Sequence, residues 1–304
     1  MYFRDSDRDN AFGFLYVAYG QKYMKESIDS ATSLKRAMPE AQIAIVTNEE
    51  SAKDFSDKLP DVFDRVVQLS PLQADINPKY YGFLNKIRGI RLSPFEYTIF
   101  VDSDTYIASS VWEIFQSLNQ YDIALAISPQ KASIPYKSSE QFLEDFSQKR
   151  SFSTALNTGI LGFKNTEAIN LFLEEWENTY IRKVPPNNEY NPLYSDQTVF
   201  CEVLNSSNIR PMILATEYNF RLGLPQNAQG LVKIFHGRPK LGWQRHEELV
   251  NSYEAYRIYI PNIALLCMDI KEGCFEIRPY SEKVEPRRVG YGQLGRLLTN
   301  LMVD

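Results

Sequence analysis

The chain alternates between short apolar runs and segments whose apolar residues recur at helical spacing. Up to Phe163 it contains six apolar runs that are typical of buried strands: 14–19, 42–48, 63–69, 97–102, 122–128 and 157–163. Helical spacing over 24–34, 49–58 and 81–92 separates the first four runs. Strands separated by such helices predict βαβ units, and therefore an α/β fold whose mostly parallel sheet has helices on both faces.

After Phe163 the alternation changes, with one long helical segment, a shorter one, and shorter apolar runs. Helices are expected over 167–182 and 196–204, and strands around 209–214 and 231–235. The sequence therefore divides into a polar N-terminal tail (1–12), a main body (13–239) and a less regular C-terminal extension (240–304). The run 256–266 could still add a strand to the main body.

The C-terminal extension ends in a segment with leucines at positions 294, 297, 298 and 301. This spacing predicts an amphipathic helix. We expect it to pack on its own domain or on a partner subunit, as in a homo-oligomer. Peripheral contact with a membrane is the alternative, because amphipathicity alone does not specify a membrane.

Composition and charge narrow the class of protein. Hydrophobic residues make up 44% of the chain and aromatic residues 13%, which is enough for a sizeable core and excludes a disordered protein. The net charge of −5 argues against a dedicated nucleic-acid binder. No apolar run approaches the ~20 residues of a transmembrane segment. Three cysteines and two histidines are too few for a disulfide framework or a His-rich metal site, so we expect a soluble, cytoplasmic protein.

The motif Asp102-Ser103-Asp104 directly follows the apolar run 97–101. In an open α/β sheet, ligands bind beyond the carboxyl ends of the strands, where two such acids can point at one place. Carboxylate oxygens suit Mn²⁺ or Mg²⁺, which in turn bind phosphate oxygens. The tripeptide alone means little, because Asp5-Ser6-Asp7 repeats it in the polar tail. The buried strand before it carries the inference, and turn-capping acids are the alternative.

Other enzymes of similar architecture fit the sequence less well. Phosphatases of the haloacid dehalogenase type have Thr or Val four residues beyond the first Asp, where this chain has Tyr106. Dehydrogenases need Gly-x-Gly-x-x-Gly after the first strand, and here only Gly20 follows it. The Gly-rich basic loop of nucleotidyltransferases is missing as well.

The strand followed by Asp-Ser-Asp-Thr (102–105) resembles the motif of GT-A fold glycosyltransferases, particularly family 8, which includes glycogenin and lipopolysaccharide galactosyl- and glucosyltransferases. The resemblance spans roughly 14–243. It implies a single Rossmann-like domain of GT-A type, a nucleotide-sugar donor, and Mn²⁺ or Mg²⁺. Asp102 and Asp104 would hold the ion with Ser103 facing the donor, and His236 would be the third metal ligand.

The resemblance also implies residues for the nucleotide and the diphosphate. Tyr19 and Tyr23 would bind the base, and Lys86 would serve the diphosphate. After the histidine the family reads His-Phe-x-Gly-x-x-Lys-Pro-Trp, whereas this chain reads His-Gly-Arg-Pro-Lys-Leu-Gly-Trp over 236–243. Because the lysine lies closer to the histidine here, either Lys240 or Arg238 would contact the diphosphate.

At the sugar end, Asn157-Thr158-Gly159 resembles the family's strand near the donor sugar, and Asp196-Gln197 resembles its Asp-Gln pair at a helix start. Asp196 would hold sugar hydroxyls, Gln197 would lie near the anomeric carbon, and Asn157 would complete the catalytic group. Structural explanations remain open. Ser195 or Asp196 could simply satisfy free N–H groups at the helix start, and Asn157 and Thr158 could be ordinary polar strand residues.

Other candidate residues have structural explanations too. His236 could be a strand-end histidine bonded to backbone, Lys86 an exposed helix lysine, and Tyr23 a core aromatic. His246, in the charged stretch Arg-His-Glu-Glu, is expected to be solvated. Cys201 lies in an apolar helix and is expected in the core.

Together these patterns lead to the hypothesis of a metal-dependent glycosyltransferase. It would move a sugar from a UDP-sugar or similar donor to a glycan, lipid-linked or protein acceptor. If the family 8 resemblance holds, the anomeric configuration is retained and no dedicated base is needed. An inverting enzyme would need a carboxylate base, for which Asp196 is the candidate. The alternative is a non-catalytic sugar-nucleotide or glycan-binding protein of the same fold.

Overall fold

The structure, a computed structural model, describes residues 11–72, 77–128, 156–184, 195–269, 271–280 and 285–290. Nearly all of the polar tail (1–12) and the whole amphipathic helix expected near the C-terminus lie outside these residues. Among the described residues, no helix is both long and apolar enough to cross a membrane.

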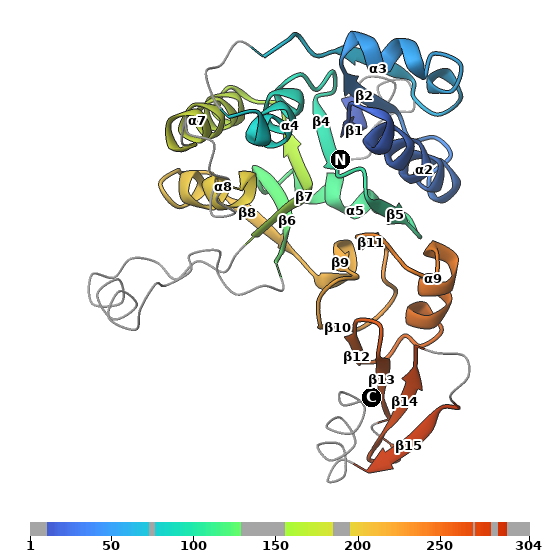
Figure 1. Cartoon of the computed structure of the whole chain (residues 1–304). Helices are drawn as coiled ribbons and strands as arrows, with labels where there is room; N and C mark the ends of the chain where they lie inside the picture. The colour runs from blue at the N-terminus through green and yellow to red at the C-terminus, as the bar shows by residue number, and fades with distance from the viewer. Residues whose placement is uncertain are drawn as a thin grey trace.

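A seven-stranded sheet in the order β3-β2-β1-β4-β7-β6-β8 forms the centre of the main body (Figure 1). Its strands are β1 (Phe12–Val17), β2 (Ile43–Thr47), β3 (Arg65–Gln68), β4 (Tyr97–Val101), β6 (Ile123–Ile127), β7 (Leu156–Lys164) and β8 (Pro211–Leu214). All six apolar runs before Phe163 are strands. β7 runs antiparallel to β4 and β6, and the other pairs are parallel, which confirms a mostly parallel sheet.

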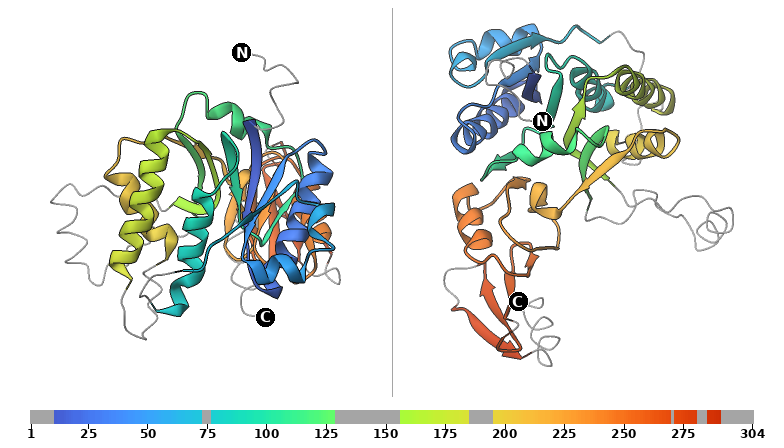
Figure 2. Two further views of the ribbon diagram at one scale, coloured as in Figure 1. Left: turned by 90° about the horizontal axis from the view of Figure 1, so that it is seen from above. Right: turned by 180° about the vertical axis from the view of Figure 1, so that it is seen from behind.

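Helices cover both faces of this sheet, as the view from above shows (Figure 2). On one face, α4 (Tyr81–Arg91), α7 (Glu167–Lys183) and α8 (Asp196–Asn205) pack through Ile87, Trp176 and Phe200. On the other face lie α2 (Gln21–Ala37) and α5 (Trp112–Ser117). The short helix α3 (Glu49–Asp54) follows β2. These packed faces confirm the predicted α/β class.

The edge of the sheet where β4 ends is also the edge where β7 begins, because the two strands are antiparallel. The pairing of β7 with β6 changes register there: Leu125 pairs with Leu161, but Ala126 pairs with Asn157. Residues 158–160 therefore have no partner on β6. Such bulges are common next to functional sites, since they redirect side chains.

Two smaller sheets follow in the second half of the chain. A three-stranded sheet has the order β5 (Thr105–Ile107), β11 (Ile234–His236), β9 (Phe220–Arg221). A five-stranded sheet has the order β10 (Gln226–Ala228), β12 (Arg257–Ile260), β13 (Ala264–Asp269), β14 (Cys274–Pro279), β15 (Arg287–Gly290), and β14 and β15 lie farthest from the main body (Figure 1). Helix α9 (Trp243–Asn251) precedes β12.

The run 256–266 does not extend the main body. It forms β12 and the beginning of β13 in the five-stranded sheet, because these strands pair with each other and with β10 and β14. The pairing of β10 with β12 also crosses the division expected at residue 239, so backbone hydrogen bonds join the two regions. The domain boundary itself stays a prediction.

The expectation that His246 is solvated was wrong. Its side chain is 2% exposed, because α9 packs the side that carries His246 and Val250 against the C-terminal region. Its Nδ1 lies 2.9 Å from the carbonyl oxygen of Gly242, and its Nε2 is hydrogen-bonded to the hydroxyl of Tyr280. Cys201 is buried, as expected.

Candidate active site

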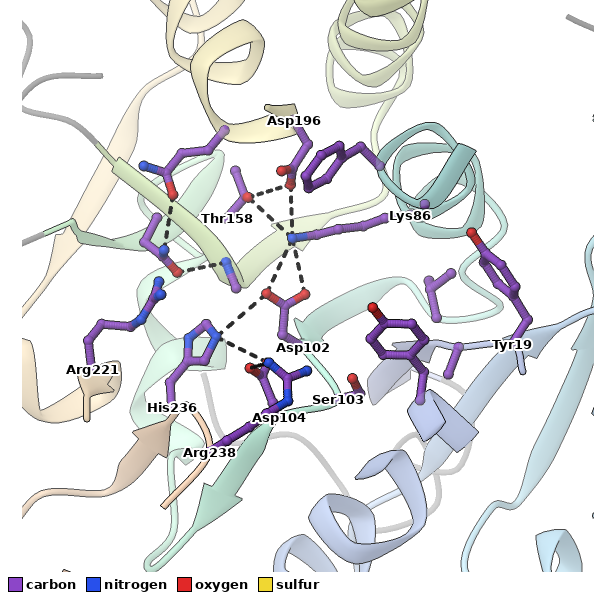
Figure 3. A pocket seen from close by; sticks show the side chains of 18 of the residues that line it. Tyr19, Lys86, Asp102, Ser103, Asp104, Thr158, Asp196, Arg221, His236 and Arg238 are labelled. Carbon is purple, nitrogen blue, oxygen red and sulfur yellow. Dashed lines mark hydrogen bonds and ion pairs between the residues drawn. The ribbon is translucent and has the colours of Figure 1, made fainter. Parts of the chain in front are cut away.

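A cleft of about 460 Å³ opens where β4 ends and β7 begins (Figure 3). All but one of the site residues expected from the sequence line it: Tyr19, Tyr23, Lys86, Asp102, Ser103, Asp104, Asn157, Thr158, Asp196, Gln197, His236 and Arg238. Lys240 is exposed and is not among the lining residues. Segments that are far apart in the sequence thus converge on one hollow.

The three candidate metal ligands lie together in this cleft. Asp102 and Asp104 follow β4, and β11 places His236 opposite Thr105 in the three-stranded sheet. One ligand atom from each of the three residues lies within 4.8 Å of the others. Nε2 of His236 is 3.3 Å from Oδ1 of Asp104 and 3.8 Å from Oδ2 of Asp102. The imidazole faces side chains, so the alternative of a histidine bonded only to backbone does not apply.

The threonine that completes the Asp-Ser-Asp-Thr motif shapes the loop. Oγ1 of Thr105 donates to the carbonyl oxygen of Asp102 at 2.9 Å and lies 2.7 Å from Oγ of Ser30 on α2. Thr105 is 1% exposed. The next residue, Tyr106, points elsewhere: it is buried and stacks on Trp243 with 5.6 Å between ring centroids.

Lys86 extends from α4 between two carboxylates, as Figure 3 shows. Its Nζ lies 3.0 Å from Oδ1 of Asp102, 2.9 Å from Oδ2 of Asp196 and 3.3 Å from Oγ1 of Thr158. Burial alone would lower the pKa of Lys86, but the Asp102 and Asp196 carboxylates outweigh it and raise the pKa above its usual range. The lysine is therefore a fixed positive charge in the cleft and not the exposed helix residue of the alternative.

Asp196 faces the cleft while its neighbour caps the helix. Oγ of Ser195 accepts a hydrogen bond from the backbone N–H of Thr198, which is the usual N-cap arrangement. Oδ2 of Asp196 instead accepts from Oγ1 of Thr158 at 2.8 Å and pairs with Lys86. Asp196 is 5% exposed. Ser195, and not Asp196, is therefore the residue that caps the start of α8.

Two tyrosines line the end of the cleft near β1. Tyr23 is 48% exposed, so it is not a core aromatic. Tyr19 also borders a second hollow of about 650 Å³, which Asn48, Gln68 and Asn85 line beyond β2 and β3. The two hollows meet at Tyr19, which gives an elongated ligand room at this end.

Three polar residues near the cleft escaped the sequence analysis: Glu26, Asn219 and Arg221. Glu26 accepts two hydrogen bonds from Arg238, at 2.7 and 2.9 Å, while Nη1 of Arg238 lies 3.0 Å from Oδ2 of Asp104. Arg221 lines the cleft, and its guanidinium makes no hydrogen bond or ion pair within the described part of the chain. Asn219 contacts His236. No sequence motif marks these residues. Asn219 directly precedes β9, Arg221 belongs to β9 and Glu26 lies on α2, so only the fold brings them to the cleft.

No protein-family model matches this chain, and no curated protein sequence does. Solved structures resemble it in fold. Mouse xyloside xylosyltransferase 1 aligns at 12% identity with a TM-score of 0.54, over 77% of this chain and 99% of that one. The glycosyltransferase GlyE of Streptococcus pneumoniae aligns at 12% identity with a TM-score of 0.50, over 76% of this chain and 55% of that one.

A third solved structure, the bifunctional glycosyltransferase WbbM, aligns at 15% identity with a TM-score of 0.49, over 71% of this chain. The match spans 40% of the WbbM chain, so this chain corresponds to less than half of that protein. The structural neighbours are GT-A glycosyltransferases, and the chain has the GT-A fold that the sequence predicts.

Proposed function

We propose that this chain is a metal-dependent glycosyltransferase that moves a sugar from a UDP-sugar or similar donor to a glycan, lipid-linked or protein acceptor. One observation carries the proposal. Asp102, Asp104 and His236 converge within 4.8 Å, and Lys86 links Asp102 to Asp196 in the same cleft. A cation held by these three residues would lie beside the ammonium of Lys86 and the polar residues of the cleft floor.

The nucleotide would lie at the end of the cleft near β1. Tyr23 presents an exposed ring on which a base can stack, and Tyr19 stands between the two hollows. The side chains of Asn48 and Gln68 border the second hollow and can hydrogen-bond the edge of a base. A nucleoside bound here would direct its diphosphate toward Asp102.

The side chains at the proposed metal site suit a divalent cation. Two carboxylates and one imidazole suit Mn²⁺ or Mg²⁺, and Asp102, Asp104 and His236 would hold the ion. A bound ion would neutralise charge on the diphosphate as it leaves. Among the described lining residues, the cations Lys79, Lys86, Arg221 and Arg238 outnumber the three carboxylates, which suits an anionic ligand.

The donor sugar would lie over β7 and the start of α8. Oδ2 of Asp196 is already occupied by Lys86 and Thr158, which leaves Oδ1 to accept from a sugar hydroxyl. Nδ2 of Asn157 donates to Oε1 of Gln197 at 3.0 Å, so the Gln197 amide is held at the mouth of this region. These contacts would orient the sugar and need no proton transfer.

Because Asp196 is paired with Lys86 and Thr158, transfer with retention of the anomeric configuration is favoured. An inverting enzyme needs a free carboxylate base beside the acceptor. The carboxylates among the described lining residues are Asp102 and Asp104, which belong to the cation site, and Asp196, which is paired. In the retaining reaction the bond from the anomeric carbon to the phosphate oxygen breaks, and the acceptor oxygen bonds to the same face. The acceptor's proton passes to the leaving phosphate oxygen.

The test is a screen of UDP-, GDP- and dTDP-sugars for hydrolysis and transfer with Mn²⁺, together with calorimetric titration of UDP and Mn²⁺. We expect Mn²⁺-dependent turnover with one nucleotide class. Asp104→Asn should lower turnover by at least about 100-fold, since even residues that only support a ligand cost 10–100-fold. Asp7→Asn, in the other Asp-Ser-Asp tripeptide, is the matched control. Tight binding without turnover of any donor would instead support a non-catalytic sugar-nucleotide-binding protein.

A further inference from the structure

His236 has a second buried contact on the side away from the carboxylates. Its Nδ1 lies 2.7 Å from Oδ1 of Asn219, which directly precedes β9. Both residues are buried, with Asn219 1% and His236 4% exposed. An imidazole and a carboxamide at this distance share a hydrogen, and which of them donates it decides what the other ring nitrogen can do.

A backbone group settles the direction of this hydrogen bond. The N–H of Gly159 donates to Oδ1 of Asn157 at 2.9 Å, and a backbone N–H can only donate. That atom of Asn157 is therefore an oxygen. Asn219 approaches the same oxygen at 2.7 Å, so it must present its NH₂ group there. Its own oxygen then faces His236, and because an amide oxygen only accepts, Nδ1 carries the hydrogen.

The hydrogen on Nδ1 determines the state of Nε2, the other ring nitrogen of His236. In the neutral imidazole one nitrogen donates and the other accepts. With the hydrogen on Nδ1, Nε2 presents a lone pair toward the oxygens of Asp104 at 3.3 Å and Asp102 at 3.8 Å. Three acceptors that converge in this way repel one another unless a positive charge lies between them. Neutral imidazole with a free nitrogen is also the form that binds metals.

We propose that Asn219 is a positioning residue that holds the neutral His236 ring with its hydrogen on Nδ1, so that Nε2 is preset for a divalent cation. The anchor is the Gly159 N–H, which acts through Asn157. This inference rests on the proposed metal site. Partners of this kind typically change metal affinity by about 10–100-fold.

The same hydrogen bonds join the two ends of the reaction region. Asn157 accepts from Gly159 and Asn219 and donates to Gln197 at 3.0 Å. One side chain thus orients both the amide expected at the sugar and, through Asn219, the imidazole expected at the cation. Asn157, which the family resemblance assigns to the catalytic group, becomes the central link between the two.

The first test reads the tautomer directly in the metal-free wild-type protein. Long-range ¹H–¹⁵N correlation spectra of ¹⁵N-histidine protein distinguish the two nitrogens once the pH is high enough for neutral rings. The chain has two histidines, so assignment is simple, and His246 is an internal reference because its Nδ1 donates to the Gly242 carbonyl. We expect both rings to carry hydrogen on Nδ1. A neutral His236 ring with hydrogen on Nε2 would overturn the inference, whatever the metal does.

The second test removes the partner. Asn219→Leu keeps approximate size but cannot accept, so His236 should lose its Nδ1 preference while His246 keeps its own. Mn²⁺ affinity, measured by electron paramagnetic resonance, should fall about 10–100-fold. Asn227→Leu, at an exposed position of β10, is the matched control and should change neither reading. A folded Asn219→Leu protein with unchanged tautomer and Mn²⁺ affinity would show that Asn219 only fills space.

The tautomer spectra and the Mn²⁺ affinity test this inference and the proposed function separately. If the wild-type protein shows the Nδ1 tautomer, and Asn219→Leu alters it, the positioning role stands on the spectra alone. If that same wild-type protein fails to bind Mn²⁺, the proposed metal site fails. The wild-type spectrum needs no variant, so the inference stays testable even if Asn219→Leu does not fold.

Discussion

Lys86 and Asp196 form an ion pair in the floor of the cleft, with 2.9 Å between Nζ and Oδ2, and their side chains are 15% and 7% exposed. The two residues come from α4 and the first turn of α8, which are neighbours on one face of the sheet. Because Lys86 also pairs with Asp102, one ammonium fixes the distance between the end of β4 and the start of α8.

Loss of this ammonium should cost stability as well as activity. Lys86→Met leaves two partly buried carboxylates without their cation, which typically costs about 3–5 kcal/mol. The raised pKa of Lys86 keeps its contribution to stability fully present below the unfolded pKa, and it is lost only as pH rises through the folded pKa. Urea unfolding at neutral pH measures the loss. Lys79→Met, at an exposed lysine of the same cleft, should change stability by less than about 0.5 kcal/mol. Equal effects of the two variants would contradict the buried-pair argument.

A side chain at Gly159 should disrupt the cation site. A Cβ there would lie 2.3 Å from Cε1 of His236 and 2.8 Å from Oδ2 of Asp102, so the ring or the strand must move. Gly159→Ala should weaken Mn²⁺ binding and lower stability by about 1–3 kcal/mol. Gly223→Ala is the control, since nothing lies within 4 Å of its Cβ. Unchanged Mn²⁺ affinity in Gly159→Ala would mean that His236 does not need its present place.

Arg238 and Lys240 should differ in their effect on the donor. Arg238 lines the cleft and reaches Asp104, whereas Lys240 is exposed outside it. We expect Arg238→Gln to raise the donor KM by about tenfold, because hydrogen bonds to charged groups contribute ~1.5–3 kcal/mol and this arginine is partly solvated. Lys240→Gln should leave KM unchanged. Steady-state kinetics with the donor found in the screen measures both KM values. A raised KM in Lys240→Gln with an unchanged KM in Arg238→Gln would assign the diphosphate contact to Lys240.

Stability should fall in mild acid because of His246. Burial lowers the pKa of His246 from its ordinary value of 6.5, so the unfolded chain binds the proton more readily than the folded one. The free energy of unfolding is therefore highest above that value, and decreases as pH falls through it toward the folded pKa. Urea unfolding between about pH 7.5 and 5.5 should show this slope, and His246→Gln should flatten it. A slope that persists unchanged in His246→Gln would contradict this assignment.

The centre of the seven-stranded sheet could be predicted because β1, β2, β4 and β7 are buried on both faces and read as continuous apolar runs. Asp102 and Asp104 could be found for the same reason, since they follow a strand whose five residues are all buried. The C-terminal strands are different. β14 alternates half-buried and buried side chains, and β9 has two residues, so neither produces an apolar run. Their pairing depends on partners that are distant in the sequence.

The buried polar residues were harder to predict than the fold. Arg-His-Glu-Glu looks solvated, yet the histidine is enclosed, and the one local signal was the four-residue spacing of His246 and Val250 on a single helix face. Asn219 carries no signal at all, because its importance comes from contacts with Asn157 and His236, which lie 62 and 17 residues away.

The antiparallel pairing of β5 with β11 also bears on how this sequence can diverge. His236 is set opposite Thr105 by strand register, and a shift of one residue would turn the imidazole to the other side of the sheet. Insertions and deletions before the histidine are therefore restricted to the loops outside β11. After it, Gly237 has a φ of 131° and the chain leaves the strand, so the spacing to the following lysine is free to vary. The unusual His-Gly-Arg-Pro-Lys order is thus compatible with an unaltered histidine position, and relatives should differ in length on the C-terminal side of this residue rather than within the strand.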